Sequence, residues 1–197
     1  MDNLADTQYA IHDLLKARWS PRAFSARPVE EDKLAALFEA ARWAPSGGNS
    51  QPWAFVVVTQ GESEAHRRLL GALTGRNPAW AGNVPVLVLA AARVYPESER
   101  RNRYAYYDTG QAVAHLTFQA HALGLYVHQM GGFDTNAACA AVGLPDEYVP
   151  MTVTAIGYLG SADDLPEDLR AREVAPRTRK PLAEFVFRGR WDHPFVP

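Results

Sequence analysis

Two short, uninterrupted apolar runs rich in valine constrain the fold more than any other feature of the chain. They read AFVVV at residues 54–58 and VPVLVLAA at residues 84–91. A strand with one face in water alternates apolar and polar side chains, whereas a strand covered on both faces carries a continuous apolar run. The sequence therefore predicts two strands that are buried on both faces.

Helical and strand patterns alternate around these runs. The helix from 108 to 123 is apolar or small almost all round, which predicts a central buried helix with Asp108 as its N-cap and Gly124 just past its end. This alternation favours an α/β or α+β fold. The other predicted helices cover 9–17, the segment from 30–32 to before Pro45, 62–75 ending at a glycine, and 137–144 closing at Gly143. Further strands are predicted at 125–130 and 151–160, with an edge strand at 182–187.

Length and composition limit the classes of protein. A chain of 197 residues that is 47% hydrophobic can bury one sizeable core, so one domain over 1–197 is expected. The net charge of -2 gives no overall attraction to nucleic acid or anionic membranes. Cys139 is the only cysteine, which excludes an internal disulfide and fits a reducing compartment. Together with an N-terminus that lacks an apolar stretch, this predicts a cytoplasmic protein.

Arginines near both ends of the chain offer a way to bind phosphate. Arg18, Ser20 and Arg22 alternate, so an extended backbone would point all three side chains the same way. Arg177 and Arg179 repeat the spacing. Guanidinium groups suit phosphate, although solvated arginines are the common alternative for such loops. Neither a P-loop nor a G-x-G-x-x-G motif after the first strand is present.

A loop of small polar residues, APSGGNSQPW at 44–53, joins the second predicted helix to the first strand. Ser46 and Asn49 offer hydrogen-bonding side chains, while Gly47 and Gly48 permit close approach of the backbone to a ligand. A plain helix-to-strand connection is the alternative interpretation.

Four segments follow one another in an order that resembles the FMN-dependent nitroreductase family over nearly the whole chain. They are RWSPR, APSGGNSQPW, GGFD and RTRKPLAEFV. The resemblance implies an α+β fold, with a central, mostly antiparallel sheet wrapped by helices. It also implies an intertwined homodimer with FMN at the subunit interface. The C-terminal segment, about 167–197, would pack on the partner subunit.

The resemblance also assigns roles to residues. Arg18 and Ser20 look like phosphate and ribityl ligands, and Arg22 would approach N1 and O2 of the flavin, where negative charge collects on reduction. Backbone N–H groups of Gly131 and Gly132 would face N5 and O4. The full set of implied cofactor-binding residues is Arg18, Trp19, Ser20, Arg22, Pro45, Ser46, Gly47, Asn49, Asn77, Gln129, Met130, Gly131, Gly132, Arg177 and Arg179.

Within this set, three further roles are implied. Gln129 and Met130 would lie against the ring, Asn77 would lie near its pyrimidine edge, and Arg177 and Arg179 would be the terminal phosphate-binding pair. The loop residues Pro45, Ser46, Gly47 and Asn49 would line the flavin site of the partner subunit.

The implied activity is hydride transfer from NADH or NADPH through flavin N5 to nitroaromatics, quinones or similar acceptors, in a ping-pong cycle. FMN carries this chemistry, so no indispensable protein acid or base is expected. Alternatives are a reductase of enones or small aldehydes, a dehalogenase of the same superfamily, or a flavin-binding protein without catalysis.

Other reactive residues point to no second chemistry. His115, His121 and His128 lack the spacing of a metal site, and Ser46 lacks a nucleophile elbow, so neither a metal nor a hydrolase is expected. The segment ERRNRYAYYD at 99–108 is predicted to be a loop over the flavin whose tyrosines shape the substrate pocket.

Overall fold

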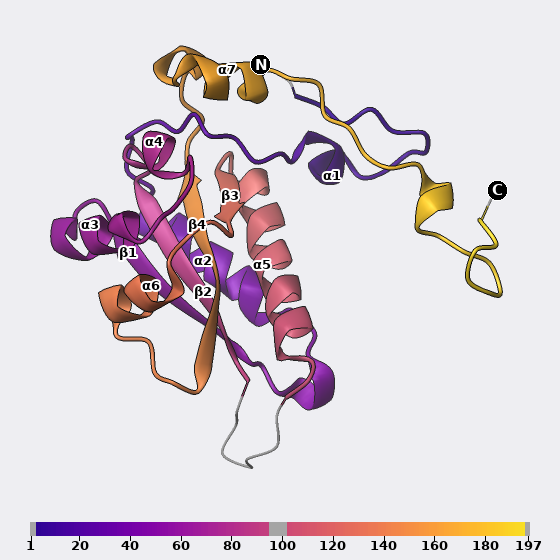
Figure 1. The fold of residues 1–197 in the computed structure, drawn as a ribbon, viewed down its shortest axis with the longest axis horizontal. Coiled ribbons are helices and arrows are strands. Elements are labelled where there is room, and N and C mark those ends of the chain that lie inside the picture. The colour runs from indigo at the N-terminus through magenta and orange to yellow at the C-terminus, as the bar shows by residue number, and fades with distance from the viewer. Residues whose placement is uncertain (1–2, 95–101, 196–197) are drawn as a thin grey trace.

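The computed structural model describes residues 3–94 and 102–195. They form one four-stranded antiparallel sheet with helices around it (Figure 1). All three strand pairings are antiparallel, as the resemblance implies. The spatial order is β1-β2-β4-β3. The strands are β1 (Trp53–Thr59), β2 (Val86–Arg93), β3 (Tyr126–Met130) and β4 (Tyr148–Gly157).

Helices fill most of the connections. The central helix predicted at 108–123 is present as α5, and Gly124 follows it with φ +75°, a value that glycine adopts without strain. The helices are α1 (Asp13–Ala17), α2 (Glu31–Arg42), α3 (Ser63–Gly71), α4 (Pro78–Ala81), α5 (Ala105–Ala122), α6 (Thr135–Val142) and α7 (Glu167–Glu173); short 3-10 turns are η1 (Gly47–Asn49), η2 (Ala162–Asp164) and η3 (Leu182–Glu184).

The sheet has a hydrophobic layer on each face. Val86 and Val88 of β2 pack with residues of α2 and α5, while Leu87 and Leu89 pack with residues of α3, α4 and α6. Consecutive strand residues point to opposite faces, so residues 86–92 of β2 are all apolar because helices cover both sides. This confirms the burial predicted for the run at 84–91. The run at 54–58 is less buried than predicted, because β1 is at the edge of the sheet and Val58 is its one buried residue.

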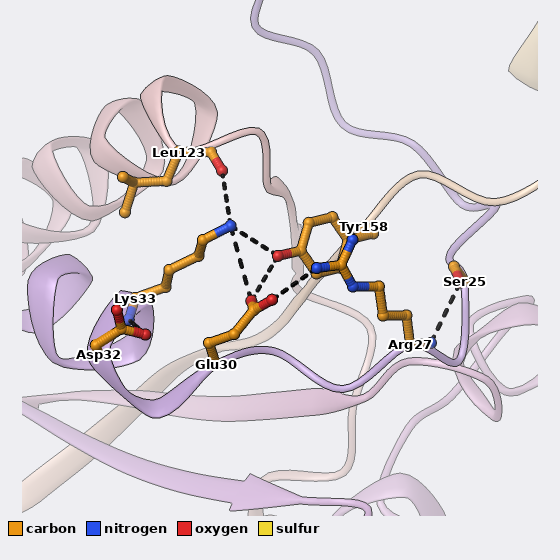
Figure 2. Close-up of polar contacts among 7 residues, drawn as sticks. All are labelled: Ser25, Arg27, Glu30, Asp32, Lys33, Leu123 and Tyr158. Carbon is orange, nitrogen blue, oxygen red and sulfur yellow. Dashed lines mark hydrogen bonds and ion pairs between the residues drawn. The ribbon is translucent and has the colours of Figure 1, made fainter.

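A polar cluster fastens the start of α2 to the end of β4 (Figure 2). The Tyr158 hydroxyl donates to Oε2 of Glu30 at 2.5 Å and accepts from Nζ of Lys33 at 2.7 Å. The guanidinium of Arg27 lies 3.9 Å from the centre of the Tyr158 ring and also bonds Glu30. The hydrogen bond from Tyr158, with smaller help from neighbouring groups, lowers the pKa of Glu30 to about 2.

Two predicted elements near the chain ends are wrong. The first helix begins at Asp13 rather than residue 9, because Nδ1 of His12 accepts the Leu14 N–H and caps it there. The predicted edge strand at 182–187 begins with the turn η3, and the N–H groups of Phe185 and Val186 donate to the Leu182 carbonyl. Phe187 forms only an isolated antiparallel bridge with Pro194. In Figure 1 the two terminal segments run together away from the sheet.

Within the described residues, no helix is long and apolar enough to cross a membrane.

Candidate functional site

The loop between α1 and α2 carries the predicted arginine clamp. Nη1 of Arg18 donates a 3.2 Å hydrogen bond to Oγ of Ser20, so these two side chains share one side of the loop. Nδ1 of His128 in β3 lies 2.8 Å from the carbonyl oxygen of Pro21. Burial lowers the pKa of His128, which favours a neutral ring that donates to this carbonyl. The loop is thereby tied to the sheet.

Three guanidinium groups from opposite ends of the chain gather beside this loop. Burial, and then the charges of Arg177 and Arg179, lower the pKa of Arg18. Nη1 of Arg177 donates to the carbonyl oxygens of Asn3 and Lys16, at 2.7 and 3.0 Å. Over residues 3–94 and 102–195, no carboxylate forms an ion pair with any of the three arginines. A cluster of like charges that lacks a counter-ion fits a phosphate group.

Aromatic contacts position Trp19 next to the arginine cluster. Its ring meets the edge of Tyr126 at 6.2 Å between centroids, and Tyr126 meets His121 at 5.5 Å. Burial, and then the charge of Arg18, lower the pKa of His121, which belongs to the last turn of α5. The arginine cluster therefore lies at the C-terminal end of α5.

Arg22 has a partner that sequence reasoning missed. Its Nη1 lies 3.6 Å from Oε2 of Glu173, the last residue of α7, and its side chain is 26% exposed. The two residues are 151 positions apart, so no local sequence pattern links them.

The end of β3 brings Asn77 next to the glycine pair. Nδ2 of Asn77 donates to the Gly132 carbonyl at 2.9 Å. A Cβ built at Gly132 would lie 2.9 Å from that Nδ2, whereas one at Gly131 would meet nothing within 4 Å. Gln129 is exposed, but Met130 is 2% exposed and packs in the core. Only the backbone of Met130 is therefore available for the predicted contact with the flavin ring.

The APSGGNSQPW loop folds into the turn η1 and is mostly exposed. Ser46 Oγ accepts the Gln51 N–H at 3.0 Å, and Gln51 Nε2 donates to the Asn49 carbonyl at 3.2 Å. Gly48, Asn49 and Gln51 all have positive φ, between 45° and 57°. Residues other than glycine rarely adopt this conformation, and such strain collects at ligand-binding loops.

Asp108 is not the N-cap that its position in the sequence predicts. α5 begins three residues earlier, because the Asn102 side chain accepts the Tyr104 N–H and starts the first turn. The Asp108 carboxylate, 3% exposed, instead accepts the Gly47 N–H at 3.0 Å. A buried acid therefore holds the loop that the resemblance assigns to flavin.

The two groups of predicted site residues lie at opposite ends of α5. The APSGGNSQPW loop is bound to Asp108 in the first turn, and Arg18 lies beside His121 in the last. Thirteen residues of helix span about 20 Å at 1.5 Å per residue. Within one chain, the APSGGNSQPW loop and the arginine cluster are therefore separated by about the length of this helix.

The predicted tyrosine loop is partly helix. Residues 99–101 lie outside the described part of the chain, and Tyr106 and Tyr107 are in α5 rather than in a loop. Tyr104 and Tyr107 are 53% and 71% exposed, so both remain accessible to a ligand or a partner. Among the described residues, no group of three or more His, Cys, Asp or Glu side chains could hold a metal.

Comparison with known proteins agrees with the geometry. Residues 15–79 and 66–158 match the model of the Nitroreductase family. A solved structure described as an oxidoreductase containing FMN is 35% identical, with a TM-score of 0.89, and the match covers 95% of this chain and 96% of that one.

Two relatives match most of their own length. An uncharacterized 15.4 kDa protein of Mycolicibacterium smegmatis is 39% identical over 125 residues, which is 64% of this chain and 84% of the relative. A protein of Rhodopseudomonas palustris provisionally named NADH dehydrogenase/NAD(P)H nitroreductase is 29% identical over 163 residues, 73% of this chain and 81% of the relative.

Proposed function

The chain belongs to the nitroreductase family, and from this premise we propose that it is an FMN-dependent oxidoreductase that uses NADH or NADPH to reduce nitroaromatics, quinones or similar acceptors. FMN supplies the chemistry when bound: hydride accepted at N5 from the nicotinamide and two electrons given to the acceptor in a ping-pong cycle. The residues of this chain bind the cofactor, orient it and adjust its electrostatic surroundings.

One observation carries the proposal, namely the gathering of Arg18, Arg177 and Arg179 without a carboxylate partner among the described residues. Arg18 and Arg177 are half-buried and Arg179 is exposed. Like charges held close together raise the free energy of the empty protein, and a dianionic phosphate relieves that cost. Ser20, hydrogen-bonded to Arg18, adds a hydroxyl to the same place. These four residues would hold the phosphate and the adjoining ribityl chain.

The remaining site residues would act on the ring. Arg22 supplies a positive charge for the N1 and O2 side. The open backbone at Gly131 and Gly132 would offer N–H groups near N5 and O4, with Gln129 exposed beside them. Asn77 would act indirectly, because its Nδ2 holds the Gly132 carbonyl in place through a hydrogen bond of 2.9 Å. Because Gly131 carries no side chain, the space around it stays open for a planar hydride donor.

We propose that the site is completed by a second copy of the chain. The family resemblance assigns the APSGGNSQPW loop to the partner's flavin, and its place about 20 Å along α5 from the arginine cluster supports that arrangement. The C-terminal segment carries exposed Phe185 and Trp191, 57% and 77% exposed, which a partner surface would cover.

The first test is the visible absorption spectrum of purified protein after incubation with FMN and desalting. A retained flavin spectrum with about one FMN per chain supports the proposed site. A colourless protein that leaves the spectrum of free FMN unchanged would overturn it. Anaerobic addition of NADH or NADPH then separates an oxidoreductase, whose flavin absorbance bleaches, from a flavin-binding protein, whose flavin stays oxidised.

A further inference from the structure

Glu173 is a buried acid bound to the backbone of the arginine loop. Its Oε1 accepts the N–H groups of Arg22 and Ala23, at 2.8 and 2.9 Å, and the residue is 3% exposed. Its other oxygen, Oε2, has no hydrogen-bond partner in the part of the chain that the structure describes, and it lies 3.6 Å from Nη1 of Arg22. One carboxylate therefore touches both the backbone and the charge of Arg22.

This arrangement is unfavourable for the helix that supplies the acid. Glu173 is the last residue of α7, where the helix dipole repels negative charge. Burying a carboxylate also costs free energy unless it is paired and hydrogen-bonded. The contacts to Arg22 and Ala23 supply that compensation, so the acid and the arginine loop depend on each other.

Packing alone does not fix the Arg22 side chain. It is 26% exposed and borders a cavity of about 130 Å³ that Trp80 and Asn83 also line. A long side chain next to open space samples several rotamers unless a partner holds it. Over the described residues, Glu173 is the carboxylate that forms an ion pair with Arg22.

We propose that Glu173 is a positioning residue for Arg22. Through Oε1 it sets the backbone from which Arg22 projects, and through Oε2 it restrains the guanidinium and offsets part of its positive charge. The inference rests on the proposed function, because Arg22 acts on a flavin only if FMN binds.

The two roles of Glu173, holding the backbone and offsetting the charge of Arg22, respond differently to substitution. Glu173→Gln keeps an amide oxygen for the two N–H groups but removes the negative charge, so the full charge of Arg22 acts on the ring. Reduced flavin, which carries negative charge near N1 and O2, should then bind more tightly relative to oxidised flavin by about three- to tenfold. This equals a rise of about 15 to 30 mV in the two-electron midpoint potential. Glu173→Ala removes both contacts and should weaken binding of oxidised FMN as well.

A double-mutant cycle with Arg22→Ala tests whether the effect passes through Arg22. The midpoint potential of bound FMN and its dissociation constant are measured for wild type, Glu173→Gln, Arg22→Ala and the double variant. Glu167→Gln, an exposed acid on the same helix, is the matched control. The proposal expects the potential to rise with Glu173→Gln only when Arg22 is present. An equal shift in both backgrounds, or no shift, would overturn the proposal.

Amide hydrogen exchange in the protein without cofactor keeps the inference separate from the proposed function. If wild type fails to bind FMN, the oxidoreductase proposal fails, yet the backbone contact can still be measured. Glu173→Ala should lower protection of the Arg22 and Ala23 amides by at least tenfold relative to the β2 amides. Unchanged protection at both amides would contradict the positioning role.

Discussion

The Gly47 amide donates a 3.0 Å hydrogen bond to the buried carboxylate of Asp108, and this contact joins the APSGGNSQPW loop to the first turn of α5. Among the described residues, the loop's other hydrogen bonds are partly internal, as between Gln51 and Ser46, and partly to neighbours, as from Asn102 Nδ2 to Ser50 Oγ at 3.4 Å. The buried carboxylate of Asp108 thus fixes the position of an exposed loop whose backbone is strained. The same principle holds at Glu173, where a buried acid fixes the arginine loop.

Replacing Asp108 tests the anchor directly. Asp108→Ala removes the acceptor and leaves the Gly47 N–H unpaired, which should lower the free energy of unfolding by about 1–3 kcal/mol. FMN retention should fall with it, because the loop loses its place. Asp108→Asn keeps an oxygen acceptor and should stay close to wild type in both thermal unfolding and FMN retention. If the Asn variant behaves like the Ala variant, the carboxylate charge rather than the hydrogen bond is responsible.

The arginine cluster should recognise the phosphate and not the ring. Arg179→Gln removes one cation while leaving the contacts of Arg177 to the N-terminal carbonyls in place, so the fold should persist. Affinity for FMN should fall about tenfold or more, whereas affinity for riboflavin, which lacks the phosphate, should not change. Fluorescence titration with both flavins measures this. Arg172→Gln, an exposed arginine on α7, is the control; equal losses for FMN and riboflavin would exclude a phosphate role for Arg179.

The two neighbouring glycines should differ in their tolerance of a methyl group. A Cβ at Gly132 would press on Asn77 Nδ2, while one at Gly131 meets nothing within 4 Å. Gly132→Ala should therefore destabilise the protein without cofactor by about 1 kcal/mol or more, and Gly131→Ala should leave its stability nearly unchanged. Melting temperatures of the two variants decide the point. Adding Asn77→Ala to Gly132→Ala should recover part of the loss, and a lack of recovery would place the strain elsewhere.

The Glu30–Tyr158 contact should stabilise the fold in a defined pH range. Because the pKa of Glu30 is lowered to about 2 in the folded protein, its contribution is present above the unfolded value of about 4.3 and is lost as pH falls toward 2. Glu30→Gln should lower the melting temperature at pH 7 and differ little from wild type near pH 2. Glu31→Gln, in the same first turn of α2, is the control. A deficit that stays constant with pH would show that the negative charge of Glu30 is not the cause.

Sequence patterns predict those parts of the structure that depend on local spacing. The buried strand β2 and the central helix follow from continuous apolar runs, and the helix ends at Gly124 and Gly143 follow from glycine at positive φ. The arginine loop was found because Arg18 and Ser20 alternate on one extended segment. These features need only a few neighbouring residues to form.

Contacts between distant segments were not predictable in this way. In the sequence, Glu173 looks like an ordinary surface acid of a charged helix, because its hydrogen-bond partners Arg22 and Ala23 lie 151 and 150 residues away. Asp108 has the residue type of an N-cap, but α5 begins at Ala105, after a turn in which the Asn102 side chain accepts the Tyr104 N–H, and local spacing does not reveal this earlier start. The segment 182–187 has strand-forming residues, yet a strand needs a neighbour, and the tail runs away from the sheet of its own chain.

Mixing two defective variants tests whether one site is built from two chains. Arg18→Gln/Arg179→Gln damages the arginine cluster, and Ser46→Ala/Asn49→Ala damages the loop about 20 Å away along α5. Each variant alone should bind little FMN. If a dimer pairs the cluster of one chain with the loop of the other, each mixed dimer holds one intact site and one doubly damaged site. Random reassembly of equal amounts should then restore about a quarter of the wild-type FMN sites.

Reassembly needs a step that separates and rejoins the subunits, so the two variants are best co-expressed with different affinity tags and purified through both. A preparation containing only mixed dimers should bind about one FMN per two chains, because one of its two sites is intact. FMN released after denaturation, divided by the protein concentration, gives this ratio. If the mixed dimer binds no more FMN than the single variants do, both groups serve the same chain, and the loop at Asp108 has no role in the partner's site.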